Sequence, residues 1–328
     1  KLTDPDKKRW GGDRPRGPYR AIFFNYGARP YADDSSTVEG YLDSEETLAA
    51  YTWLWDLVDS GSTPTPAEME VLGTEGTGPI DLFLAGRLAM ATLNQGHMLN
   101  ATEAGANFGI VPEPGVPGQT SYMHGWSLTS SIWKGTEHPQ EAWEFLSYWV
   151  GPEGQKYLMD NGNLFPSIPS VLETYKDADK DYVQAFFRVL AQEQDAEWLM
   201  GHPCYRGAVQ RAMAAEFEAA HPNIKVNVTV LPASGFGEKM TTALGAGEGA
   251  PDVAFFWDNN WFPEALELSP YIEADPDFSP DLYFPGFWNT RAMWGDKVVG
   301  LPLGVGANFV MYNKDVFDEA GVAYPSED

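Results

Sequence analysis

Apolar and polar positions along the chain follow a helical spacing in some stretches and a strand spacing in others. In residues 43–58, apolar side chains fall at i, i+3, i+4 and i+7. Asp43 with Glu46 has the form of a capping box, so this stretch predicts an amphipathic helix. Its apolar positions are Tyr51, Leu54, Trp55 and Val58. A second amphipathic helix is predicted over 137–150, with Ala142, Phe145, Leu146, Trp149 and Val150 on its apolar face.

The second half of the chain alternates between predicted helices and predicted strands. By the same criteria, helices are expected over 207–220 and 235–246, and strands over 89–93, 108–111, 224–230 and 252–256. This rhythm is typical of an α/β fold, and we expect sheets that are mainly parallel and flanked by helices. Ligands of such sheets sit beyond the carboxyl ends of strands, which points to the loops after Leu231 and Phe256.

Length and charge narrow the classes of protein to consider. The chain has 328 residues, more than one compact core usually holds, so two lobes are expected. Lys and Arg total 21 against 47 Asp and Glu, a formal net charge of −26, which disfavours nucleic acid and anionic lipid as partners. No apolar run approaches the roughly 20 residues of a membrane span. The charged opening is not a signal peptide, so we expect any export signal to have been removed or never to have been part of this stretch of chain.

The sequence offers little for metal or cofactor chemistry. Cys204 is the one cysteine, so an internal disulfide is excluded and a cysteine zinc site has no further ligand. Residues 177–181 resemble the start of a calcium loop but lack its Gly at the sixth position and its closing Glu. Residues 151–156 are not a phosphate loop, because their spacing is short and they follow a helix. We expect no cofactor.

Eight short segments together resemble one protein family. In the last third they are Leu244–Asp252, Trp257–Trp261, Gly295–Pro302 and Tyr312–Gly321. In the first half they are Leu82–Met90, Gly125–Trp126, His138–Phe145 and Gly151–Lys156. The set is similar to the extracellular solute-binding proteins of sugar ABC importers, the class that includes the maltose- and oligosaccharide-binding proteins.

The resemblance implies a two-lobed periplasmic-binding-protein fold of type II with a hinge between the lobes. The segments that come last here come first in the family, so the chain is expected to be circularly permuted or written in an order that differs from its gene. Residues 1–123 with 309–328 are expected to form the family's C-terminal lobe, and 124–195 with 196–308 its N-terminal lobe. The permuted junction is expected near 192–207, where the family's last helices are absent.

The function implied by the resemblance is capture of a sugar or oligosaccharide without chemical change. The two lobes would close about the hinge on a solute, and the closed form would dock to the membrane permease of an ABC transporter. Such a protein is expected to be a monomer that works outside the cell or in the periplasm, with a lipid anchor at the cell surface as one option.

Aromatic, amide and carboxylate side chains after predicted strands are the candidate sugar contacts, because aromatic faces stack on pyranose rings and polar groups bond hydroxyls. On one lobe they are His202, Phe236, Trp257, Asp258, Asn259, Asn260 and Trp261. The alternative for the two tryptophans is that one of them packs beneath the loop. From the other half come Tyr19, Tyr26, His97, Trp126 and Asn308. The family often carries a Trp at the position of His97, so a maltodextrin-type site is in doubt.

Two other functions compete with this interpretation. A glycoside hydrolase needs two carboxylates at a fixed separation, and Asp258 has as neighbours only Glu264 and Glu267 on the following helix. A binder of a glycerol-phosphate or a peptide needs cationic groups in the cleft, for which Arg29, Arg87 and Arg291 are the candidates.

Overall fold

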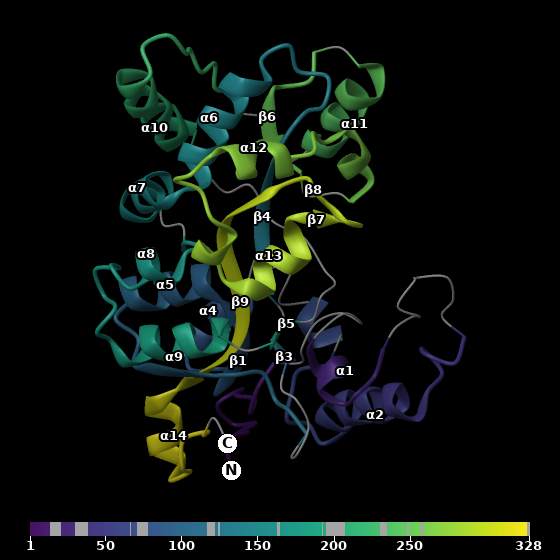
Figure 1. The fold of residues 1–328 in the computed structure, drawn as a ribbon. Helices are drawn as coiled ribbons and strands as arrows, with labels where there is room; N and C mark the ends of the chain where they lie inside the picture. Colours follow the sequence, from purple (N-terminus) through teal and green to yellow (C-terminus); the bar gives the residue numbers. More distant parts are fainter. Residues whose placement is uncertain are drawn as a thin grey trace. The chain divides into compact units, whose positions relative to one another are not determined.

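The chain divides into two compact units, described here separately (Figure 1). Unit 1 comprises Lys1–Gly125, Asp179–Asp195 and Gly306–Asp328, and unit 2 comprises Trp126–Ala178 and Ala196–Val305. The computed structural model describes residues 1–13, 21–29, 39–65, 67–70, 78–116, 122–123, 125–162, 165–191, 193–194, 207–229, 235–247, 249–256 and 259–326. Residues 179–195 belong to unit 1, whereas the sequence-based boundaries group them with 124–178. The assignment of either unit to a lobe of the family stays a prediction.

Unit 1 is built around the second half of a long strand. Its helices are α1 (Ala21–Asn25), α2 (Glu45–Asp59), α4 (Pro79–Leu84), α5 (Gln95–Glu103), α9 (Asp181–Leu190) and α14 (Lys314–Ala320). Its strands are β1 (Met90–Asn94), β2 (Phe108–Val111), β3 (Tyr122–Met123), β5 (Glu193–Gln194) and the later part of β9 (Leu301–Asn313). Both β1 and β2 pair antiparallel with β9, which is therefore the central strand of this unit. Phe309 and Met311 of β9 are fully buried, and α9 packs against β2.

Unit 2 packs helices around an apolar core. Its helices are α6 (Pro139–Val150), α7 (Pro152–Gly162), α8 (Pro169–Leu172), α10 (Gly207–Ala220), α11 (Phe236–Ala246), α12 (Ser269–Ala274) and α13 (Pro285–Arg291), with 3-10 turns η1 (Asn259–Glu264) and η2 (Pro280–Leu282). Its strands are β4 (Gly125–Ile132), β6 (Val253–Phe255), β7 (Met293–Trp294), β8 (Lys297–Val298) and the start of β9. β4 lies between β9 and β6 and pairs antiparallel with β6. Trp143, Leu146 and Trp149 of α6 enter the core.

Most predicted elements are confirmed, and the fold is mixed α/β as expected. The helices at α2, α6, α10 and α11 and the strands at β1, β2 and β6 all form. The face predicted for α2 is partly wrong, because Tyr51 is 46% and Trp55 is 58% exposed while Ala50 and Leu54 are buried. Its N-cap is Ser44, whose side chain accepts a hydrogen bond from the Thr47 amide, so Asp43 is not the cap.

The expectation of mainly parallel sheets is wrong for the described residues. The ladders of β1 and β2 with β9 and of β4 with β6 are antiparallel, whereas the two-residue pair of β3 and β5 runs parallel. The alternation of helical and strand patterns along the chain predicts the order of the elements. The partner and direction of each strand are decided by tertiary packing. The predicted strand at 224–230 is also absent over 224–229. There the Val226 amide donates to the side chain of Glu218 (2.8 Å).

A buried polar network joins α7 to the start of β9 in unit 2. The Gln155 side chain is fully buried, and its Nε2 donates to the Val150 carbonyl (2.6 Å) and lies within hydrogen-bond distance of Ser167 Oγ and the Pro302 carbonyl. Its Oε1 accepts from the Ser167 amide (2.7 Å). One side chain thus satisfies four partners from three separate stretches of the chain, which fixes where β9 begins.

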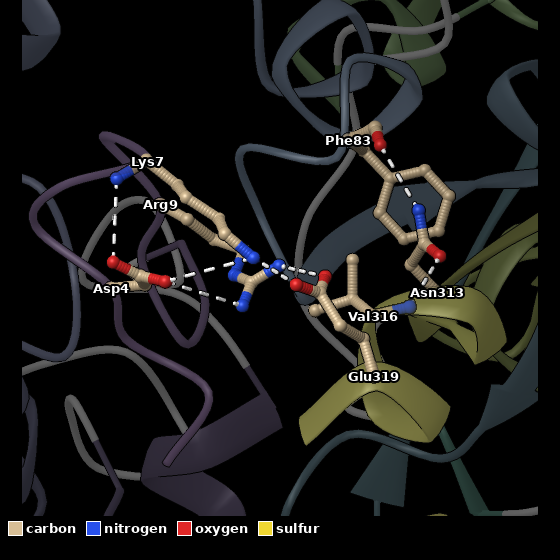
Figure 2. Close-up of polar contacts among 7 residues, drawn as sticks. All are labelled: Asp4, Lys7, Arg9, Phe83, Asn313, Val316 and Glu319. Atoms are coloured by element: carbon tan, nitrogen blue, oxygen red, sulfur yellow. Dashed lines mark hydrogen bonds and ion pairs between the residues drawn. The ribbon is translucent and has the colours of Figure 1, made fainter. Parts of the chain in front are cut away.

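The chain's first residues lie against α14 in unit 1 (Figure 2). Lys7 Nζ and Arg9 Nη1 both bind the carboxylate of Glu319, with 2.8 Å between Arg9 and Glu319. Asp4 lies 3.9 Å from both basic groups. These two cations lower the pKa of Glu319 to about 2. At the other end of α14, Asn313 caps the helix by accepting from the Val316 amide (3.2 Å) and donates to the Phe83 carbonyl (3.4 Å).

This pairing predicts a pH-dependent contribution to stability. The folded pKa of Glu319 lies below its usual 4.5, so the folded state holds fewer protons on this group than the unfolded state between those values. The contribution is complete above pH 4.5 and is lost as the pH falls toward 2. We expect the free energy of unfolding of the native chain to fall more steeply over this range than that of Glu319→Gln, in urea titrations at pH 5.5, 4 and 3. Parallel pH curves would contradict it, and 1 M salt should narrow the difference.

Candidate functional site

In unit 1, neutral polar side chains gather where β1 ends and α5 begins. β1 ends at Asn94 and α5 starts at the next residue. Asn94 pairs in register with Asn308 of β9, which is 6% exposed. The Gln95 side chain accepts from the Ala307 amide (3.3 Å). The pairing of β1 with β9 therefore brings Gln95 and His97, which follow the end of β1, near Asn308 in the middle of β9, although about 210 residues separate Asn308 from the other two.

His97 occupies the third position of α5 and takes part in its cap. The Asn94 side chain accepts from the amides of Gly96 (3.0 Å) and His97 (3.4 Å), and His97 Nδ1 lies 3.4 Å from the Asn94 amide, which donates to it. With Nδ1 as the acceptor, the proton of the neutral imidazole lies on Nε2. The donor hydrogen of the half-buried ring is then on Nε2.

In unit 2, the segment after β6 folds into η1 and brings several predicted residues together. Asn260 is exposed on η1. Trp261 is 3% exposed, and its indole Nε1 donates to Thr241 Oγ1 (2.9 Å). Its ring lies 6.1 Å from that of Phe236, the half-buried first residue of α11, and the same distance from Phe256. Trp261 therefore packs beneath the loop. This is the alternative considered from the sequence for one of the two tryptophans, Trp257 and Trp261.

The other predicted residues are described in part or not at all. Tyr19, His202, Trp257 and Asp258 lie outside the described residues, as does Cys204. Trp126 lies in β4 and Asn259 begins η1, but their side chains are not described. Tyr26 borders the small core between α1 and α2, with its ring 6.4 Å from that of Trp53. Burial, with Asp56 nearby, raises the pKa of Tyr26, which keeps its hydroxyl protonated.

The carboxylates that a glycosidase would need beside Asp258 have structural partners. Glu264 forms an ion pair with Lys134 (3.1 Å). Glu267 accepts from the Ser269 hydroxyl (2.7 Å) and the Val298 amide (3.2 Å). These contacts hold the segment after η1 and leave neither carboxylate as an evident acid or base for catalysis.

The arginines proposed for an anionic solute contact aromatic rings. The guanidinium of Arg29 lies 5.1 Å from the ring centre of Phe24, and that of Arg87 lies 5.5 Å from Trp10. Arg87 also donates to the Lys8 carbonyl (3.2 Å). The side chain of Arg291 is not described. Both described guanidinium groups thus have contacts within unit 1.

Other features of the described residues do not add to the candidate site. One open hollow of about 520 Å³ lies along α11, and another of about 390 Å³ lies between α6 and α12; their linings do not include a predicted solute contact. The described residues contain no group of three or more His, Cys, Asp or Glu that could hold a metal ion. Among the described helices, none has the length and apolar character needed to cross a membrane.

Of the Asn94–His97 stretch, only His97 is among the sugar contacts predicted from the sequence. The signal for Asn94 was available, since an Asn directly after an apolar strand is a favoured N-cap. No sequence signal pairs Asn94 with Asn308, because that pairing depends on the register of two strands distant in the chain.

Comparisons with known proteins agree on one family. Residues 5–185 match one model of the bacterial extracellular solute-binding proteins, and residues 206–327 match another. A protein of Brucella abortus (strain 2308) named as a binding protein is 29% identical over 112 residues, 33% of this chain and 26% of that protein. The arabinooligosaccharide-binding protein of Bacillus subtilis (strain 168) is 32% identical over 120 residues, 34% of this chain and 26% of that protein. The matched part thus spans about a quarter of these relatives. No solved structure matches the chain.

Proposed function

Because the chain belongs to the bacterial extracellular solute-binding proteins, we propose that it captures a sugar or short oligosaccharide and hands it to the membrane permease of an ABC importer. Proteins of this family bind their solutes without transforming them, so the function proposed here is not enzymatic. Its site of action is outside the cytoplasmic membrane.

The observation that carries the sugar assignment is the neutral polar cluster at the junction of β1 and α5. Amides of Asn94, Gln95 and Asn308 and the imidazole of His97 lie where β1 ends beside the middle of β9. Amide and imidazole groups both donate and accept hydrogen bonds, which suits the hydroxyls of a neutral sugar. The similarity to a protein named for arabino-oligosaccharides supports the same class of solute.

In unit 2, Trp257, Asp258 and Asn260 are the proposed contacts. Trp257 and Asp258 come directly after β6 and before η1, a position from which an indole can stack on a sugar ring. Because Trp261 is buried in the core, Trp257 is proposed as the stacking residue of the pair. Closure of two lobes on the solute, with contacts from both, is the proposed mechanism.

The first test is a titration with a panel of sugars, from monosaccharides to arabino-, xylo- and malto-oligosaccharides. A bound sugar at 100 times its dissociation constant is expected to raise the free energy of unfolding by about 2.7 kcal/mol, since it binds only the folded state. The readouts are the midpoint of thermal unfolding and intrinsic tryptophan fluorescence. The absence of any change with every sugar in the panel would overturn the sugar assignment.

The second test asks whether Trp257 stacks on the bound sugar. Trp257→Ala is expected to weaken binding of the sugar found above by at least tenfold, because a ring that loses its stacking partner loses about 1.5–3 kcal/mol. The matched control is Trp294→Ala, which removes an exposed indole from the β7–β8 hairpin of the same unit and is expected to leave the affinity unchanged. Equal losses in both variants would remove Trp257 from the site.

The competing enzymatic function is tested with the same protein. Release of reducing sugar from chromogenic glycosides, abolished in Asp258→Asn, would replace binding by hydrolysis. The rearranged order of the family's segments is a separate proposal, and the nucleotide sequence of the gene decides it.

A further inference from the structure

Helix α2 exposes an apolar face that the core of unit 1 does not use. Leu48 is 66%, Tyr51 is 46% and Trp55 is 58% exposed. At 3.6 residues per turn these three side chains lie within one sector of the helix, directly beside the sector of the buried Ala50 and Leu54. They form what is here called the α2 apolar face.

The contacts of α2 with α1 involve mainly the other part of its apolar surface and reach the α2 apolar face at Tyr51. Phe23 meets Tyr51 edge to face at 4.9 Å, and Tyr26 lies 6.4 Å from Trp53. Ile22 and Phe23 of α1 form a buried cluster with Ala50 and Leu54. Tyr51 therefore joins this core to the α2 apolar face, while Leu48 and Trp55 belong to none of the buried clusters of the described residues.

Carboxylates lie along one edge of the α2 apolar face, and residues 39–65 place no cation among them. Residues 39–65 contain six Asp and Glu and no Lys or Arg. Around the helix, the exposed Asp59, Glu45 and Asp56 follow directly after Leu48. The surface thus combines an apolar centre, which includes a Trp and a Tyr, with an acidic rim.

We propose that the α2 apolar face is a docking surface for a protein partner whose apolar groove is ringed by Lys and Arg. Tyr and Trp are the residues that most often carry binding energy at protein interfaces, and opposite charge at the rim speeds and orients association. A second copy of this chain would set one acidic rim against another and carries a net charge of −26, so it is disfavoured. The same charge disfavours an anionic membrane.

This inference goes beyond the proposed binding of a solute. None of the candidate solute contacts lies on α2. A variant that removes the α2 apolar face can therefore be compared with the native chain for sugar binding and for docking independently.

The test selects peptides from a phage-displayed random library on the native chain. We expect enriched peptides in which large apolar residues are flanked by Lys and Arg. The double variant Leu48→Gln, Trp55→Gln is expected to bind these peptides at least tenfold more weakly, with an unchanged unfolding midpoint because neither side chain is part of a core. The control Leu84→Gln, an exposed apolar residue of α4 in the same unit, is expected to bind them as the native chain does.

The proposal is overturned if enriched peptides bind the double variant and the native chain equally, or if they lack basic residues. It is also overturned if sedimentation shows dimers that the double variant abolishes, or if vesicles of anionic lipid bind the native chain through the same residues. Retention of sugar binding by the double variant separates this result from that of the proposed function.

Discussion

Gln155→Leu is expected to lower the free energy of unfolding by about 3 kcal/mol, because it leaves the buried Ser167 amide without a partner and removes further hydrogen bonds from two buried carbonyls. The carbonyls of Val150 and Pro302 each lose the Gln155 donor but keep a hydroxyl, that of Tyr283 and that of Ser167 respectively. A buried group left without a partner costs about 1–3 kcal/mol. Leu has a similar volume, so a cavity does not account for the loss.

Urea unfolding followed by tryptophan fluorescence measures this effect. The matched control is Gln140→Leu, on the exposed side of α6 in the same unit, where the change is expected to stay within about 0.5 kcal/mol. Gln155→Glu keeps the acceptor oxygen but loses the donor, and should also be destabilised. A loss below about 1 kcal/mol in Gln155→Leu would show that the network does not hold the start of β9.

Gly154→Ala is expected to destabilise the chain by about 2–3 kcal/mol, against the usual direction of this change in a helix. A Cβ on Gly154 would lie 2.4 Å from the Tyr148 carbonyl oxygen and 2.5 Å from that of Trp149. Both are backbone atoms at the end of α6 and cannot rotate away. The glycine therefore lets the first turn of α7 approach the end of α6. This close approach is the structural role of the glycine in residues 151–156, the segment that resembles a phosphate loop only superficially.

The control for Gly154 is another helical glycine with open space around it. A Cβ on Gly245 of α11 meets no atom within 4 Å, so Gly245→Ala is expected to be neutral or to stabilise by up to about 1 kcal/mol. Thermal unfolding of both variants gives the comparison. Equal effects of the two substitutions would mean that the close approach of α6 and α7 does not require a glycine at position 154, and that helix propensity alone accounts for the change in stability.

Local pattern was enough to predict many of the elements. The boundaries predicted at 108–111, 207–220 and 235–246 agree with β2, α10 and α11 to within one residue. In these stretches, the spacing of apolar side chains and the turn residues at their ends act over a few residues, so no distant contact is needed. The motif set is also local in sequence, and the comparisons bear out its assignment to the bacterial extracellular solute-binding proteins.

The candidate site was predictable only in its residue types. The sequence placed His97 after a strand and Asn308 near a crossing strand, and the register of β1 with β9 brought them together. It could not distinguish a stacking tryptophan from a packed one, because the burial of Trp261 depends on Thr241, Phe236 and Phe256. Packing partners that are far apart in the chain leave no local signal.

What the amino-acid pattern determined is therefore the set of helices and short strands and the family to which the chain belongs. Only the tertiary structure decided that β1 and β2 run antiparallel to β9, that Trp261 belongs to the core, and that Tyr51 and Trp55 face outward. The reason is that periodicity reports which positions share a face, whereas burial of that face depends on what the rest of the chain packs against it.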